Sequence, residues 1–219
     1  MKERLNKEEA KRVIEILLKT YPDAKSELNF SNSFELLIAT ILSAQTTDVQ
    51  VNKVTEKLFK EFKTPGDFLK LKEEELAEKI RSIGFYRNKS KNILATCKLL
   101  VDKYKGQVPD TREELMKLPG VGRKTANVVL SNAFGKDAIA VDTHVFRVSN
   151  RIGLANSDNV LDTEKELMDI IDKNIWSKAH HLLIFHGRRI CKARKPLCHK
   201  CPLTEYCLYY KKTSMDKEL

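Results

Sequence analysis

The sequence predicts an all-α protein of 219 residues. Apolar residues recur at the three-to-four-residue spacing of an amphipathic helix along most of the chain. No run of alternating polar and apolar residues is long enough to indicate a β-sheet. The periodic segments are joined by short connections, and we find no repeat, linker or low-complexity stretch. These observations favour helices packed into one large or two small domains.

The expected helices can be assigned in chain order. The N-terminal residues form an amphipathic helix that ends at Pro22. Ser33 is expected to cap the second helix and Asp48 the third. A short helix opens at Thr111, which begins a T-x-x-E capping-box pattern. The other predicted helices are 34–42, 49–62, 72–83, 88–104, 124–133, 143–151, 162–172 and 177–186, followed by a frayed tail over 213–219.

The net charge favours a polyanionic partner. Forty Lys and Arg residues against thirty Asp and Glu give a formal charge of +10 at pH 7 and a pI near 9.3. An anionic membrane surface is the alternative partner, but no apolar run approaches the ~18 residues of a spanning helix. The N-terminal segment also lacks the apolar core of a signal peptide. We therefore expect a cytoplasmic protein with reduced thiols.

Four of the five cysteines lie close together near the C-terminus. They are Cys191, Cys198, Cys201 and Cys207, with the spacing C-x6-C-x2-C-x5-C. A structural zinc site is the main alternative, but zinc sites of four cysteines usually contain two C-x2-C pairs, and only one is present here. A compact loop with four thiolates favours an iron–sulfur cluster. Cys97 stands among apolar residues at helical spacing and is expected to be a buried core thiol.

A glycine hairpin joins two of the predicted helices. Gly120 and Gly122 flank Val121 in a turn that needs positive φ or close backbone approach. Such a hairpin directs backbone N–H groups outward at the N-terminus of the following helix, which suits a phosphate. A glycine turn by itself merely joins helices in most proteins. The neighbouring Arg123 and Lys124 make phosphate binding the favoured interpretation here.

Lys124 and Asp142 are the candidate reactive pair. The helix from Lys124 to about residue 133 is roughly 15 Å long, and the residues after it can run back far enough to return Asp142 to its start. Positive potential at this helix N-terminus favours a neutral, nucleophilic amine, and a carboxylate can stabilise developing positive charge. The alternative is equally consistent with the spacing: a surface lysine that binds phosphate, with Asp142 an ordinary helix N-cap.

Two loops offer side chains that suit a nucleic-acid stack. Gln45 lies in the polar connection 43–48 and has the size to fill a gap between bases. Phe85 lies in the turn 84–87 and has the shape of an intercalating wedge. Taken alone, each segment favours a plainer interpretation, a capped turn for the first loop and a core aromatic for Phe85.

Taken together, these segments resemble the endonuclease III family, bifunctional DNA glycosylases of the helix-hairpin-helix superfamily. The resemblance covers almost the whole chain. It rests on the segments ELNF, FELLIATILSAQTTD, LPGVGRKTANVVL and AVDTHVFRV, on the Gly-Phe-Tyr turn and on the cysteine loop. Their order and spacing are far more specific than any single motif.

The resemblance assigns roles to residues. Lys124 matches the family's Schiff-base lysine and Asp142 its catalytic aspartate. Gln45 matches the residue that fills the gap left by the extruded base. Phe85 stands where the family more often has an aliphatic wedge. The remaining implied DNA contacts are Gly120, Val121, Gly122, Arg123 and His144, and the implied [4Fe–4S] ligands are Cys191, Cys198, Cys201 and Cys207.

The resemblance also implies an architecture of two helical domains with the active site in the cleft between them. A six-helix barrel would span 22–136, with the helix-hairpin-helix motif at about 111–134. Residues 1–21 and 137–219 would form a discontinuous iron–sulfur domain.

The implied activity is base excision repair. The enzyme would remove oxidised pyrimidines from double-stranded DNA and nick the abasic site by β-elimination through a lysine Schiff base, acting as a monomer at the nucleoid of the cytoplasm. Adenine–DNA and thymine-mismatch glycosylases are the related alternatives, although those families usually lack lysine at the position of Lys124. A non-catalytic DNA-binding or redox-sensing module is the alternative from another class.

Overall fold

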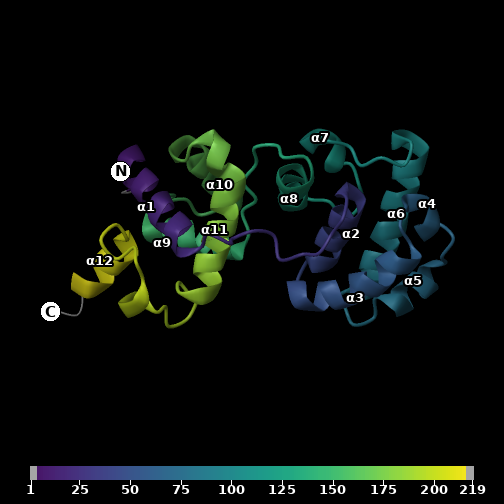
Figure 1. Cartoon of the computed structure of the whole chain (residues 1–219), viewed down its shortest axis with the longest axis horizontal. Helices are drawn as coiled ribbons and strands as arrows, with labels where there is room; N and C mark the ends of the chain where they lie inside the picture. The colour runs from purple at the N-terminus through teal and green to yellow at the C-terminus, as the bar shows by residue number, and fades with distance from the viewer. Residues whose placement is uncertain (1–3, 216–219) are drawn as a thin grey trace. The chain divides into compact units, whose positions relative to one another are not determined.

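The computed structural model describes residues 4–215, and every regular element within this range is a helix. The all-α prediction is therefore confirmed. None of the helices in these residues combines the length and apolarity that crossing a bilayer requires. The chain divides into two compact units, one formed by Ser26–Lys136 and the other by Met1–Lys25 together with Asp137–Leu219 (Figure 1).

The unit Ser26–Lys136 is built around one almost completely buried helix. Its helices are α2 (Ser33–Ser43), α3 (Asp48–Glu61), α4 (Pro65–Phe68), α5 (Glu73–Lys79), α6 (Tyr86–Tyr104), α7 (Arg112–Leu115) and α8 (Arg123–Ala133). Eight of the eleven residues of α2 are buried, and this helix packs against α3, α6 and α8. Its apolar sequence, with few polar residues on any face, suits this central position. α4 and α5 pack on α6, and α7 packs on α8.

Two helices of this unit are capped by the residue that precedes the expected cap. Asn32, not Ser33, caps α2, since its Oδ1 accepts the backbone N–H of Glu35 at 2.9 Å. Thr47, not Asp48, caps α3. In both cases two capping residues stand side by side in the sequence, and the extended backbone of the first one selects it as the cap.

The second unit combines the N-terminal helix with the C-terminal third of the chain. Its elements are α1 (Lys7–Thr20), α9 (Thr143–Ile152), α10 (Val160–Ile170), the 3-10 turn η1 (Lys173–Ile175), α11 (Trp176–Arg189), the 3-10 turn η2 (Cys198–Lys200) and α12 (Leu208–Met215). α11 packs against both α1 and α9, and α10 and α12 also pack on α9. The end of α12 replaces the first part of the expected frayed tail, and 216–219 lie outside the described residues.

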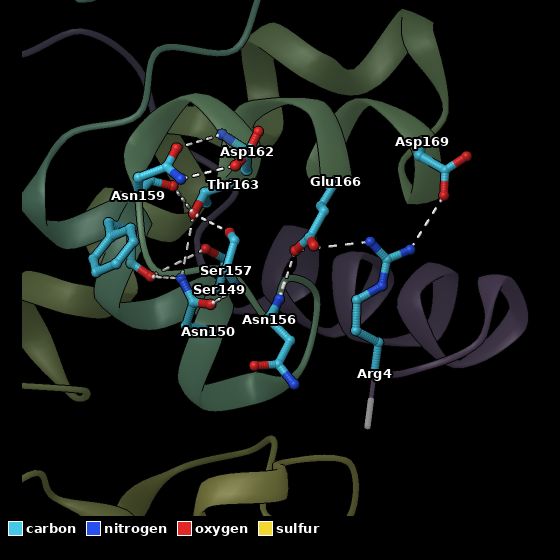
Figure 2. A network of polar contacts seen from close by, with 11 residues as sticks. Arg4, Ser149, Asn150, Asn156, Ser157, Asn159, Asp162, Thr163, Glu166 and Asp169 are labelled. Atoms are coloured by element: carbon cyan, nitrogen blue, oxygen red, sulfur yellow. Dashed lines mark hydrogen bonds and ion pairs between the residues drawn. The ribbon is translucent and has the colours of Figure 1, made fainter. Parts of the chain in front are cut away.

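A polar network closes the loop between α9 and α10 (Figure 2). Asn150 binds this loop by accepting the backbone N–H of Ser157 at 2.8 Å. Glu166 on α10 accepts the N–H of Asn156 at 2.6 Å and lies 3.7 Å from the guanidinium of Arg4, which also reaches Asp169. The segment before α1 is thereby joined to α10, far away in the sequence.

Candidate functional site

The glycine hairpin between α7 and α8 has the conformation that its sequence requires. Gly120 adopts a left-handed φ of 78°, and a Cβ at this position would lie 3.2 Å from the side chain of Asn92. Thr96 on α6 donates a hydrogen bond of 2.9 Å to the carbonyl of Pro119. Val121 is buried. The hairpin is therefore held rigidly on the body of its own unit.

Gly122 leaves the start of α8 open. It is the N-cap of this helix in an extended conformation, and no atom lies within 4 Å of where its Cβ would be. A glycine cap has no side chain to accept the first amides of the helix, which favours the binding of an anion at this helix end. Arg123 and Lys124 follow as the first two helical residues, and Lys124 is exposed. A phosphate group and a reactive lysine can thus share this helix end.

Gln45 and Phe85 both stand in left-handed backbone conformations, with φ values of 55° and 57°. Such values are uncommon for residues other than glycine and cluster at functional positions. Both side chains are exposed, and Phe85 retains 67% of its surface, so the expectation of a core aromatic is wrong. Gly84 lies against the Gln45 loop, since its Cβ would be 3.5 Å from the carbonyl oxygen of Gln45. The two side chains therefore project from adjacent turns.

Asp142 and His144 lie at the start of α9 in the other unit. Asp142 is the N-cap, and its Oδ1 accepts the backbone N–H of Val145 at 2.8 Å. Asp142 therefore caps α9 with one carboxylate oxygen, and this capping bond does not engage the second oxygen. His144 Nδ1 lies 3.1 Å from Arg147. Because Arg147 also donates to the carbonyl of Cys191, His144 belongs to the polar surroundings of the cysteine loop.

The four C-terminal cysteines line one pocket of their unit. Burial raises the pKa of Cys201 to about 11, and neighbouring thiolates add to this effect. Four ionised thiols therefore need a strongly cationic group between them, and soft thiolates select iron–sulfur clusters or zinc. In residues 4–215 no three His, Cys, Asp or Glu side chains are spaced to hold a single metal ion. Four thiols that line one pocket are a donor set that fits an iron–sulfur cluster.

Nitrogen atoms of Arg151 and His186 lie close to two of these thiols. Arg151 Nη1 lies 3.6 Å from Cys191 Sγ. His186 Nε2 lies 3.6 Å from Cys201 Sγ, and its other nitrogen lies 3.1 Å from the hydroxyl of Tyr21. Burial lowers the pKa of His186 to about 4, so its imidazole is neutral at pH 7. Such contacts orient thiolate ligands and tune a bound cluster.

Comparison with known proteins shows which family this chain belongs to. Residues 38–173 match the model of the HhH-GPD superfamily of base excision DNA repair proteins. An endonuclease III of Rickettsia conorii is 54% identical over 199 residues, which cover 91% of this chain and 95% of the relative. The chain belongs to the endonuclease III family. Residues 191–207 match the iron–sulfur binding domain of endonuclease III, so this chain carries a [4Fe–4S] cluster.

Solved structures support the same family. The structure of a trapped endonuclease III–DNA covalent intermediate is 55% identical, has a TM-score of 0.92 and covers 96% of this chain and 99% of that chain. A thermostable thymine-DNA glycosylase is similar in fold, with a TM-score of 0.85 over 94% of this chain and 98% of that chain, but only 28% identical. The higher identity therefore favours endonuclease III over the thymine-DNA glycosylase.

One residue of this region is not identified by its sequence pattern. Lys89 on α6 is buried, with 6% of its surface exposed, although lysines are rarely buried. Its neighbours in the sequence are charged or polar, so nothing in the local pattern distinguishes it from a solvent-exposed lysine.

Proposed function

We propose that this protein removes oxidised pyrimidines from double-stranded DNA and nicks the resulting abasic site, with Lys124 as the nucleophile. Family membership establishes the enzyme class, a DNA N-glycosylase with lyase activity at abasic sites. The observation that carries the residue assignment is the exposed Lys124 at the open N-terminus of α8, directly after the glycine hairpin. A structural relative at 55% identity was trapped as a covalent intermediate with DNA.

The first step is a substitution at C1′ of the damaged nucleotide. The nucleotide leaves the base stack, which costs least where pairing is already weak. The amine nitrogen of Lys124 forms a bond to C1′ while the glycosidic bond breaks, and the departing base takes the bonding electrons and one proton of the lysine nitrogen. Asp142 stabilises the positive charge that develops on the sugar. Its Oδ1 is occupied by the N–H of Val145, so Oδ2 is assigned to this task.

The second step cleaves the strand. The bond between C1′ and the ring oxygen then breaks, the ring oxygen takes the remaining proton of the lysine nitrogen, and an imine forms between Lys124 and C1′. This imine acidifies the C2′ proton, and removal of that proton expels the 3′ phosphate by β-elimination. Water then hydrolyses the imine and regenerates the lysine. One lysine thus serves both the excision and the nicking reaction.

Binding to DNA relies on backbone and side-chain contacts. Gly120 and Gly122 present backbone N–H groups to a phosphate, and Arg123 adds positive charge. Val121 belongs to the same DNA-binding hairpin and closes it by donating its N–H to the carbonyl of Leu118 at 3.1 Å. Gln45 fills the gap left by the flipped nucleotide, and Phe85 enters the stack as a wedge. His144 is a further DNA contact. The net charge of +10 supports duplex DNA as the partner of a monomeric enzyme.

The [4Fe–4S] cluster shapes the C-terminal loop. Its ligands are Cys191, Cys198, Cys201 and Cys207, and when bound it supplies the cationic centre that holds the loop 191–207 in shape.

The unit that contains Ser26–Lys136 acts as the helical barrel, with the helix-hairpin-helix motif at 111–134. The other unit acts as the iron–sulfur domain. The site of action is the cytoplasm, at the nucleoid.

The decisive experiment is borohydride trapping on a duplex with a single thymine glycol. The wild type should give a covalent protein–DNA complex, and Lys124→Gln should bind the duplex but give neither complex, free base nor nick. Lys98→Gln, which removes an exposed lysine from α6, is the matched control and should behave like the wild type. Nicking by purified Lys124→Gln would refute the assignment. Release of free base by the wild type without trapping would indicate a monofunctional glycosylase.

A further inference from the structure

The buried ammonium group of Lys89 is surrounded by hydrogen-bond acceptors. Its Nζ donates to the carbonyl of Leu42 at 2.8 Å, to the carbonyl of Ala44 at 2.6 Å and to the hydroxyl of Thr46 at 3.3 Å. These three bonds use all three donors of an ammonium group. Burial lowers the pKa of Lys89, because removing the charge from water disfavours it. The three bonds are the interactions that offset this cost.

The acceptors belong to the end of α2 and the turn that follows it. The last carbonyls of a helix have no partner within the helix, and they carry partial negative charge. A lysine ammonium group is therefore a favourable partner at this point. Leu42 lies in the last turn of α2, and Ala44 is its C-cap. Since Thr46 also accepts from Lys89, the contacts enclose Gln45, whose side chain remains exposed.

Lys89 also contacts the turn that carries Phe85. It is the fourth residue of α6, and its backbone N–H donates to the carbonyl of Phe85 at 3.0 Å. Phe85 is the N-cap of this helix. A single residue therefore connects the Phe85 turn, through the first turn of α6, to the loop that carries Gln45.

We propose that Lys89 is a positioning residue that holds Gln45 and Phe85 as one preorganised pair for insertion into damaged DNA. The proposal rests on the DNA contacts of Gln45 and Phe85 given under the proposed function. Left-handed residues persist only where their surroundings hold them, and the side chain of Lys89 supplies such a constraint on the loop of Gln45. Because Lys89 lies in the first turn of α6, directly after Phe85, the same bonds tie the Gln45 loop to the Phe85 turn. Because Lys89 is buried, its contribution passes through the exposed pair. Preorganisation of this kind raises affinity by reducing the entropy lost on binding.

The test is a double-mutant cycle between Lys89 and Gln45. The variants are Lys89→Met, Gln45→Ala and the double variant, and the readout is the Kd for a duplex with one tetrahydrofuran abasic analogue. An undamaged duplex of the same sequence is the reference. Lys89→Met keeps the length of the side chain but removes the charge and the donors. Lys98→Met removes an exposed charge from the same helix and is the matched control.

The proposal predicts a specific and non-additive effect. Lys89→Met should weaken binding to the abasic duplex on the order of tenfold, with the Kd for undamaged DNA changed by less than about twofold. In the Gln45→Ala background the same change should cost less than about threefold, because the side chain that Lys89 positions is already absent. Lys98→Met should leave the ratio of the two Kd values at the wild-type level.

Other outcomes overturn the proposal and show which part has failed. If Gln45→Ala binds the abasic duplex like the wild type, the proposed function of Gln45 is wrong, and the positioning role falls with it. If Gln45→Ala weakens binding but Lys89→Met does not, only the positioning role is wrong. Equal losses in both backgrounds would indicate a purely structural lysine. Should Lys89→Met fail to fold, Lys89→Arg, which keeps a charged donor, takes its place with the same criterion of non-additivity.

Discussion

The carboxylate of Asp142 accepts the backbone N–H of Val145 at 2.8 Å and thereby caps α9. An aspartate that caps a helix is held in a defined rotamer, with one oxygen engaged and the other directed elsewhere. The two interpretations of Asp142, helix cap and catalytic group, are therefore compatible. They can be separated because asparagine caps a helix as well as aspartate but carries no charge.

Asp142→Asn should keep the stability of the protein but lose base excision. The amide oxygen can still accept the N–H of Val145, whereas the sugar cation loses its stabilising charge, so single-turnover excision should fall by about 10²-fold or more. Asp142→Ala should lose excision and, in addition, about 1 kcal/mol of unfolding free energy because the cap is removed. Denaturant unfolding and single-turnover excision of thymine glycol measure the two effects. Near-wild-type excision by Asp142→Asn would contradict the catalytic assignment.

Phe85→Gly should raise the stability of the protein and lower its affinity for damaged DNA. Glycine adopts the left-handed conformation of this position without steric cost, and the phenylalanine side chain is 67% exposed, so stability should rise by up to about 1 kcal/mol. The affinity for a duplex with an abasic analogue should fall, because the wedge is absent. Phe85→Leu is the control and should match the wild type in both thermal unfolding and DNA binding. A Phe85→Gly variant with unchanged affinity would exclude the wedge role.

The cysteines should differ in whether their loss removes the cluster from the protein. Cys198→Ala should lose the cluster, measured as iron content and visible absorbance of the purified protein. Cys97→Ala should keep it, because Cys97 is fully buried in the unit Ser26–Lys136, where burial raises its pKa to about 12. This control should cost only about 1 kcal/mol of stability for the small cavity. Full iron content in Cys198→Ala would remove this residue from the ligand set.

Stability should decrease as the pH falls below 6.5, with His181 as one cause. Burial lowers the pKa of His181 to about 3, and the charges of His180 and Lys178 act in the same direction. The unfolded chain therefore binds this proton at a higher pH than the folded protein. Stability from His181 is fully present above the unfolded pKa near 6.5 and is lost as the pH falls toward 3.

At pH 5 this single residue should account for a loss of about 2 kcal/mol relative to pH 7.5. His181→Gln removes the titrating group and should reduce the difference between the unfolding free energies at the two pH values by this amount. Denaturant unfolding at both pH values measures the effect. An unchanged difference in His181→Gln would show that other groups cause the pH dependence.

Much of the local structure could be predicted because its causes are local. Gly120 is required by a turn with positive φ, and the helix after Gly122 is set by apolar residues at helical spacing. The spacing of the four cysteines likewise favours a cluster over zinc before any coordinates are known. The two kinds of site differ in how their cysteines are spaced within a short stretch of chain. Where two capping residues are adjacent, as at Asn32 and Ser33, the sequence leaves the choice open, since either side chain can accept the same amides.

The helical class, the glycine hairpin, the cysteine loop and, through the order of these segments, the resemblance to one family could all be predicted from the sequence. The exposure of Phe85 and the burial of Lys89 became visible with the packed helices, and both reverse the usual expectation for these residue types. Neither could be predicted, because burial depends on which segments pack together. Lys89 meets carbonyls more than forty residues earlier in the chain. A contact of that range leaves no trace in local periodicity.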